Sequence, residues 1–209
     1  MTISVRKSSV TLVLKWAQRL LFAGAIVMLG YCGFVLVDAW IFQKRANVEL
    51  ERWVHVETAS NVRTPGESPA SPKSSLPLVS GELIGRMEIP RLSLSVVVLE
   101  GTGKPALRRA AGHIAGTGLP GQPGNVGIAA HRDTYFRPLQ KIQRDDIITL
   151  TTLRGEYRYR VVSTKVVSPY DVAVLNPDGA EILTLVTCYP FYFVGSAPNR
   201  FIVRAARVL

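Results

Sequence analysis

The longest apolar run of the chain lies near its N-terminus. The stretch "LLFAGAIVMLGYCGFVLV", residues 20–37, carries no charge, and after Asp38 the residues "AWIF" extend the apolar character to Phe42. A helix needs about 20 mostly apolar residues to cross about 30 Å of hydrocarbon. A buried core helix is the alternative, but runs this long that also contain glycine are rare in soluble cores. The pattern therefore predicts one transmembrane helix over residues 20–42.

The segment that follows, residues 43–80, contains two kinds of sequence. The first part, "QKRANVELERWVHVE", keeps a helical pattern and predicts a stalk helix over residues 43–57. Residues 58–80 are rich in Pro, Ser and Thr and offer little that packs. Such a composition is typical of an extended linker. We expect this linker to separate a folded domain from the bilayer.

From Gly81 onward the hydrophobic pattern is that of β-strands. Alternating or wholly apolar runs are bounded by proline and glycine, and only "KPALRRAAGHIAG" suggests a short helix. The predicted strands are residues 83–90, 92–100, 125–130, 182–187 and 200–209, with a hairpin around Arg154–Gly155 within residues 146–167. Seven or eight short strands with few helices predict an all-β barrel or sandwich of roughly 130 residues.

Charges around the apolar run predict its orientation. Residues 1–19 carry four basic side chains and no acidic one, whereas basic and acidic residues are mixed after residue 37. The positive-inside rule then favours a cytoplasmic N-terminus and a C-terminal domain on the extracytoplasmic face. A cleaved signal peptide is the competing interpretation, but its apolar core normally spans only about 7–15 residues before a small-residue cleavage site. We therefore expect an uncleaved signal-anchor in the cell membrane.

The net charge of +10 does not predict a nucleic-acid-binding protein. Between Ser80 and Leu209 there are 16 Lys and Arg against 10 Asp and Glu, and the basic residues are scattered rather than clustered. No group of His, Cys and carboxylates has metal-ligand spacing, and no phosphate-binding glycine motif is present. We expect no nucleic acid partner, no metal and no cofactor.

The two cysteines differ in their surroundings. Cys32 lies inside the predicted span, so Cys188 is the single cysteine of the exported part and has no intramolecular disulfide partner there. A lone cysteine is either a small buried hydrophobe or a functional thiol. As a nucleophile it would need a nearby base or a lowered pKa.

Three residues sit where predicted strands meet loops. His131 follows the apolar strand "NVGIAA", Cys188 follows "ILTLVT", and Arg200 begins the next strand. Strand ends on a rigid sheet are well placed to converge. If the last strand pairs antiparallel with the cysteine strand, Arg200 and Cys188 reach the same rim, where a guanidinium would stabilise an oxyanion. Each residue alone also has a structural interpretation, as a hydrogen-bonded histidine or a solvated arginine.

These motifs resemble those of the sortases, most closely the class D-like group. The resemblance rests on "TLVTC", the following "APNRFIVRA" and the upstream "GNVGIAAHRDTYF", and it covers residues 81–209. It implies a closed eight-stranded β-barrel with short helices and a membrane-anchored cysteine transpeptidase. Sortases usually have a glycine before the histidine, and here Ala130 occupies that position.

The resemblance also implies a role for each residue that matches a motif. Cys188 would be the nucleophile, His131 the general acid and base, and Arg200 the group that stabilises the transition state. Arg204 lies on the same strand face and is the competing arginine. His113 lies outside this set, and we interpret it as structural or peripheral.

By the same resemblance, the substrate is an exported protein with an LPxTG-like C-terminal sorting signal. Cleavage would follow its threonine, and an amine such as that of cell-wall peptide would accept the acyl group. Hydrolysis is an open alternative. Thr187 is expected to position backbone or substrate. Tyr189 and Tyr192, in the loop "YPFYFVGSAP", either line the peptide groove or pack on the barrel.

Other proteins with a catalytic cysteine fit less well. In a papain-like protease the cysteine precedes the histidine and lies on a helix, which is the opposite of the order seen here. L,D-transpeptidases have an S-x-G-C-x-R motif around their cysteine, and "TLVTCYP" lacks this motif. A non-catalytic, membrane-tethered β-barrel that binds peptides is the alternative from a different functional class.

Overall fold

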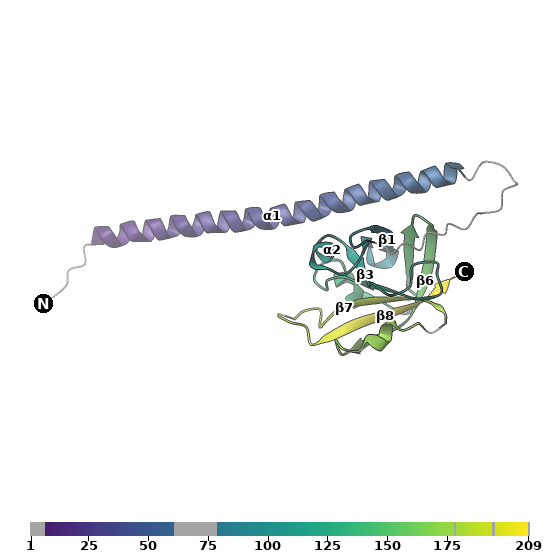
Figure 1. Cartoon of the computed structure of the whole chain (residues 1–209). Helices are drawn as coiled ribbons and strands as arrows, with labels where there is room; N and C mark the ends of the chain where they lie inside the picture. The colour runs from purple at the N-terminus through teal and green to yellow at the C-terminus, as the bar shows by residue number, and fades with distance from the viewer. Residues whose placement is uncertain (1–6, 61–78, 178, 194, 209) are drawn as a thin grey trace. The chain divides into compact units, whose positions relative to one another are not determined.

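The computed structural model describes residues 7–60, 79–177, 179–193 and 195–208 of the chain (Figure 1). The chain divides into two compact units, Met1–Ile41 and Phe42–Leu209. One helix, α1 (Lys7–Ser60), runs through the first unit and into the second. The predicted linker, residues 58–80, therefore begins within a helix, and most of the remainder lies outside the described residues.

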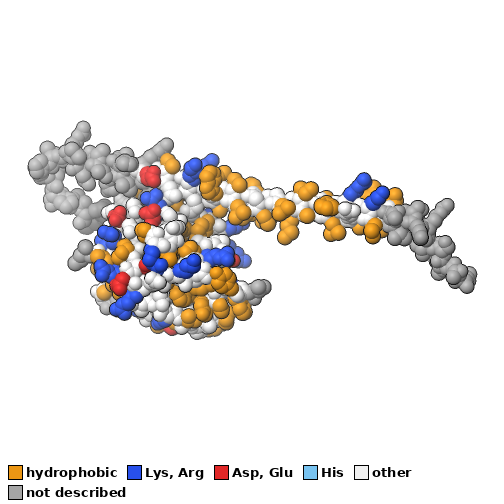
Figure 2. Space-filling model, turned by 180° about the vertical axis from the view of Figure 1, so that it is seen from behind, with side chains coloured by type: hydrophobic (Ala, Val, Ile, Leu, Met, Phe, Trp, Pro, Cys, Tyr) orange, Lys and Arg blue, Asp and Glu red, His pale blue; other side chains and the backbone are white. Residues whose placement is uncertain are grey.

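The first unit is an apolar helix. Its large hydrophobic side chains, such as Leu20, Phe22 and Leu29, are more than half exposed. Figure 2 shows hydrophobic side chains along this helix, with Lys and Arg on either side of the apolar stretch. The segment Leu12–Val48 is long and apolar enough to cross a membrane, and it contains the predicted span 20–42. These properties make α1 a candidate membrane anchor.

The second unit contains a closed, mixed β-barrel, in which some neighbouring strands are parallel and the others antiparallel. Within the described residues its strands follow the order β1-β2-β3-β4-β7-β8-β6-β5, and β5 pairs with β1 to close the ring. The strands are β1 (Leu83–Ile89), β2 (Leu94–Glu100), β3 (Ala111–His113), β4 (Gly124–Ala129), β5 (Ile147–Thr152), β6 (Gly155–Val167), β7 (Glu181–Tyr189) and β8 (Asn199–Val208). The prediction of a closed eight-stranded barrel with few helices is confirmed.

Short helices connect these strands. The predicted helix after Gly103 is α2 (Lys104–Arg109), which starts with a proline in its first turn, where the missing N–H costs nothing. Three further connections contain 3₁₀ helices within the described residues: η1 (Pro90–Leu92), η2 (Arg137–Lys141) and η3 (Val172–Leu175).

The barrel interior is filled by apolar side chains from alternate strand positions. On β4 these are Val126 and Ile128, and on β7 they are Leu183 and Leu185, all at most 1% exposed. Successive side chains of a strand point to opposite faces. The intervening residues of β4 and β7 therefore lie on the outer face of the sheet, which is the face that carries the candidate site.

The start of the second unit packs on the outside of the barrel. Ala46 of α1 is buried with Val97 and Leu99 of β2 and with Ala106 of α2. The Gln43 amide donates to the Arg109 carbonyl at 2.6 Å and accepts from the Val97 N–H at 3.0 Å. A short stretch of α1 from Phe42 onward is thus part of the folded domain.

Candidate active site

The sheet register brings the three candidate residues into one row. In the antiparallel pair of β7 and β8, Cys188 and Arg200 are direct partners. In the parallel pair of β4 and β7, the last partners are Ala129 and Val186. If this register is extended by two residues beyond the end of β4, His131 lies opposite Cys188. The row therefore runs from the end of β4 across β7 to the start of β8.

All three side chains belong to the accessible outer face. Leu183 and Leu185 point into the core, so Cys188 points away from it by strand alternation. On β8, Val203 and Ala205 are fully buried, which gives Arg200 the outer face as well. His131 is exposed, and Cys188 and Arg200 are partly exposed. A substrate can therefore reach the thiol from solvent.

Thr187 joins the ends of the two strands that carry the thiol and the imidazole. Its side chain is 2% exposed, and its hydroxyl donates to the Ala130 carbonyl at 2.8 Å. The Ala130 N–H donates to the Val186 carbonyl at 3.3 Å. These bonds extend the β4–β7 pairing past the end of β4, up to the residue before His131.

Arg200 also holds part of the connection between β7 and β8. Its Nη1 donates to the carbonyls of Ala197 at 3.3 Å and Asn199 at 3.0 Å. Among the described residues, both of these bonds use the same guanidinium nitrogen. Arg204 pairs with Thr184 instead. Arg204 lies four positions further along β8, about 13 Å away at 3.3 Å per residue, so Arg200 is the arginine in the row of Cys188.

Comparison with known proteins decides the family. Residues 87–208 match the sortase domain family. Sortase D of Bacillus subtilis (strain 168) is 30% identical over 189 residues, which cover 90% of this chain and 96% of that protein. The chain belongs to the sortase family.

Solved structures of sortases share this fold. A sortase D5 transpeptidase of Clostridium perfringens is 31% identical, with a TM-score of 0.58 over 63% of this chain and 82% of that one. Sortase A of Corynebacterium diphtheriae is 28% identical, with a TM-score of 0.59 over 78% and 84% of the two chains. Sortases are cysteine transpeptidases, so the chain is an enzyme of this class.

The two tyrosines predicted to contact substrate occupy different environments. Tyr189 lies on the opposite face of β7 from Cys188, and its ring centroid is 6.2 Å from that of Phe201 and 6.1 Å from that of Phe191. Phe191 and Phe201 in turn pack against the barrel core. For Tyr189, the structure therefore favours the alternative in which the aromatic residues of this loop pack on the barrel.

Tyr192 lies at the surface of the sortase domain. Its side chain is 73% exposed, and the Arg137 guanidinium lies over its ring at 5.6 Å. A hydrogen bond from Gln140, and then one from Arg137, lower the pKa of Tyr192 below its usual value. Both partners belong to η2 (Arg137–Lys141), so Tyr192 tethers the β7–β8 connection to this helix while remaining open to solvent.

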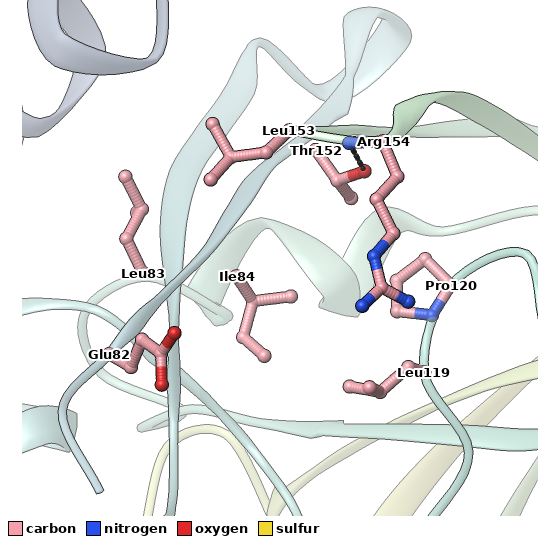
Figure 3. A pocket seen from close by; sticks show the side chains of 8 residues that line it. All are labelled: Glu82, Leu83, Ile84, Leu119, Pro120, Thr152, Leu153 and Arg154. Atoms are coloured by element: carbon pink, nitrogen blue, oxygen red, sulfur yellow. Dashed lines mark hydrogen bonds between the residues drawn. The ribbon is translucent and has the colours of Figure 1, made fainter. Parts of the chain in front are cut away.

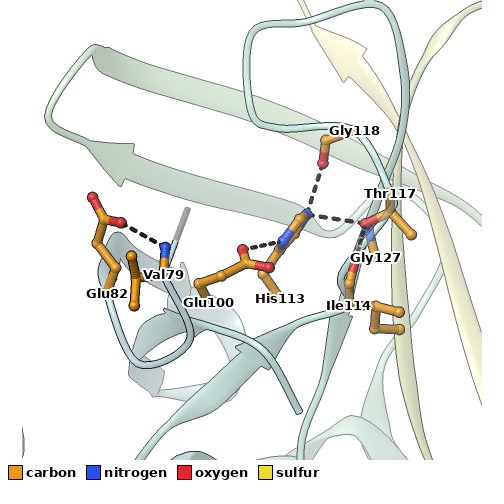
Figure 4. Close-up of polar contacts among 8 residues, drawn as sticks. All are labelled: Val79, Glu82, Glu100, His113, Ile114, Thr117, Gly118 and Gly127. Carbon is orange, nitrogen blue, oxygen red and sulfur yellow. Dashed lines mark hydrogen bonds and ion pairs between the residues drawn. The ribbon is translucent and has the colours of Figure 1, made fainter. Parts of the chain in front are cut away.

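His113 lies in a buried polar network (Figure 4). Its Nδ1 is 2.6 Å from a Glu100 carboxylate oxygen, and its Nε2 is 2.9 Å from the Gly118 carbonyl and 3.0 Å from the Thr117 hydroxyl. The Thr117 hydroxyl also accepts the Gly127 N–H of β4 at 3.0 Å. His113 is 3% exposed and holds β2, β3 and β4 together, which agrees with the structural interpretation of this residue.

A small pocket of about 150 Å³ lies elsewhere on the barrel (Figure 3). Leu119 and Pro120, which form part of its wall, precede the start of β4, whereas His131 follows its end. The pocket is therefore at the opposite end of the barrel from Cys188 and forms no part of the candidate site.

Two anchoring residues were not singled out from the sequence. Asn125 is 2% exposed, and its amide donates to the Val174 carbonyl at 3.0 Å and accepts from the Thr184 hydroxyl at 2.7 Å. It thereby fixes the connection between β6 and β7. The second anchor is Arg132, which holds the connection between β7 and β8. The side-chain hydrogen bonds described for both residues reach partners 49 to 63 positions away, so local patterns carry no signal for these roles.

Proposed function

We propose that this sortase cleaves an LPxTG-like C-terminal sorting signal after its threonine and transfers the acyl group to an amine. The observation that carries the proposal is the register row, in which Cys188 is paired with Arg200 and the extension of β4 leads to His131. A thiol, an imidazole and a guanidinium in one accessible row are the groups that acyl transfer through a thioester requires.

In the first half of the reaction, the Cys188 thiolate attacks the main-chain carbonyl carbon of the substrate threonine. The carbonyl oxygen becomes an oxyanion, and the nitrogens of Arg200 not bound to Ala197 and Asn199 stabilise it. Protonated His131 then gives its proton to the leaving amine as the C–N bond breaks. The products are a thioester on Cys188 and a free C-terminal fragment with a new amino group.

In the second half, an incoming amine attacks the thioester carbonyl. His131, now neutral, accepts the proton that the amine loses, and the Cys188 sulfur leaves as a thiolate. A new amide bond replaces the thioester, so both proton and thiolate return to their starting positions. The acceptor we propose is an amine of cell-wall peptide. Water in place of the amine would give hydrolysis instead.

We further propose a layout for the whole chain. Residues 1–19 are cytoplasmic, residues 20–42 span the cell membrane, residues 43–80 form a stalk and linker, and residues 81–209 are the catalytic domain on the extracytoplasmic face. The apolar character of Leu12–Val48 and the basic residues before it support this arrangement. Such a layout presents the enzyme to exported substrates.

Mass spectrometry of products from a peptide panel tests the proposed reaction. The purified chain is incubated with LPxTG-like peptides and a small amine acceptor, beside Cys188→Ala, His131→Ala and Arg200→Ala proteins. Cleavage after threonine with an amine adduct, lost in the Cys188→Ala protein, is the expected result. Peptide binding without any cleavage across the panel would instead favour the non-catalytic binding module.

A further inference from the structure

Arg132 connects the histidine end of the site to the loop that follows the cysteine. It is the residue after His131, and its Nη1 donates to the Pro190 carbonyl at 2.9 Å. Its Nη2 donates to the carbonyls of Phe193 at 2.7 Å and Gly195 at 3.1 Å. All three acceptors are main-chain groups of the connection between β7 and β8, so this side chain ties together segments about 60 residues apart in sequence.

The chemistry of these contacts suits arginine alone. The guanidinium offers several N–H donors in a fixed planar fork, whereas a lysine ammonium is a compact, strongly hydrated point charge. Hydrogen bonds from a charged donor are shorter and roughly twice as strong as neutral ones. The Phe193 ring, at 5.8 Å from Cζ, adds a cation–π contact. Three main-chain carbonyls and one aromatic ring of the connection thus gather around the Arg132 guanidinium.

Phe191 packs against the barrel core, but apolar burial contributes little to the two residues after it. Tyr192 is 73% exposed and Phe193 is 44% exposed, so neither side chain is held in the core. The second half of the connection is held by Arg200, through Ala197 and Asn199. Loss of the Arg132 bonds would therefore loosen the main chain at Phe193 and Gly195, while the sheet register, the Phe191 packing and the Arg200 contacts persist.

We propose that Arg132 is a positioning residue, which clamps the β7–β8 connection against the end of β4 and so shapes the wall of the peptide site beside Cys188. The expected effect on KM rests on the proposed function, whereas the expected effect on the connection itself does not. Arg132 contacts neither the thiol nor the reacting carbonyl in this account. Its effect is to keep the wall ordered before the peptide arrives, so that binding does not have to supply the ordering free energy.

Kinetics and hydrogen exchange of the full chain test this proposal together. For Arg132→Ala we expect KM to rise by about tenfold or more, with a smaller change in kcat, as for a lost binding contribution. Alkylation of Cys188 by iodoacetamide, which needs no peptide wall, should stay within about twofold of wild type. Amides of residues 191–193 and of Gly195 should exchange faster, with the amides of β7, β8 and the other barrel strands unchanged. Arg132→Lys should be intermediate, because one ammonium cannot serve three diverging carbonyls.

Arg144→Ala is the matched control, since it removes an exposed arginine before β5 and should leave every readout unchanged. Unchanged KM and unchanged exchange in Arg132→Ala would overturn the proposal. Faster exchange throughout the barrel would also overturn it, because that pattern indicates a general structural role. If wild-type protein cleaves no peptide, the proposed function fails, while the exchange experiment still decides whether Arg132 clamps the loop.

Discussion

At the scale of single residues, the site depends on which face of a strand each side chain occupies. Cys188 and Tyr189 are neighbours in sequence, yet the first faces outward and the second packs against Phe191 and Phe201. β7 extends one residue past the cysteine, to Tyr189. Because alternation along a strand has a period of two, the Tyr189 side chain lies on the opposite face from Cys188. The sequence indicated a strand ending at Thr187 and so left the role of Tyr189 open.

The two arginines of β8 should differ in their effect on catalysis. Arg200 is the partner of Cys188, whereas Arg204 pairs with Thr184. Removal of an oxyanion-stabilising donor typically costs about 10²–10³ in kcat. We therefore expect Arg200→Ala to lower kcat/KM by about that factor and Arg204→Ala to lower it much less, as measured with a fluorogenic peptide. The reverse order would transfer the catalytic role to Arg204.

Thr187 should contribute to both stability and activity. Thr187→Val keeps the shape of the side chain but leaves the Ala130 carbonyl without its hydroxyl donor. A buried acceptor left unsatisfied costs about 1–3 kcal/mol, so urea unfolding should show a loss in this range and kcat/KM should fall with it. Thr164→Val, on an exposed position of β6, is the control and should change neither value. An unchanged free energy of unfolding in Thr187→Val would contradict this assignment.

At the scale of elements, the sequence predicted most strands of the barrel because they are long and regular in pattern. β3, of three residues, was not predicted, because its identity comes from pairing with β2 and β4 rather than from its own pattern. The clamp at Arg132 and the anchor at Asn125 were missed for the same reason. Their partners lie about 50–60 residues away in sequence, and only the closed barrel brings them together.

An ion pair between two connecting elements should govern stability in acid. Arg91 of η1 binds Asp146 through Nε to Oδ1 and through Nη2 to Oδ2, the latter at 2.6 Å. The Arg91 hydrogen bond, followed by that from the Gln143 N–H, lowers the pKa of Asp146. Its stabilisation is then fully present above the ordinary aspartate pKa of about 3.9 and is lost as pH falls through the lowered folded-state pKa.

Thermal unfolding between pH 7 and pH 2 checks this prediction. Asp146→Asn should have a lower Tm than wild type at pH 7, and the difference should shrink as the pH falls below about 3.9. Arg91→Ala should behave in the same way. A Tm difference that stays constant down to pH 2 would show that the charge on Asp146 is not what stabilises these connections.

At the scale of the whole molecule, one helix carries the apolar surface that distinguishes the two units. Leu12–Val48 is long and apolar enough to span a bilayer, while the barrel packs a core of buried apolar residues. We expect the full chain to enter the detergent phase in a Triton X-114 separation and a chain beginning at residue 43 to stay in the aqueous phase. Equal partitioning of the two proteins would argue against a membrane anchor.

The resemblance to a known family added the overall architecture, which the hydrophobic pattern alone did not determine. Of the residues chosen from strand ends and from resemblance, Cys188 and Arg200 are direct partners, and His131 lies two residues past the last paired residue of β4. Their catalytic roles stay a prediction. The pattern alone left a sandwich and a barrel open, because both bury alternate strand positions. Closure depends on the long-range pairing of β1 with β5, which no local pattern encodes.

Trapping the acyl-enzyme tests the central claim most directly. The full chain is mixed with an LPxTG-like peptide without an amine acceptor, quenched in acid and measured by intact-protein mass spectrometry. We predict a mass increase equal to the peptide fragment ending in threonine minus one water, located on Cys188, removed by hydroxylamine and absent from Cys188→Ala. The adduct on another residue, or cleavage that persists in Cys188→Ala, would contradict the account.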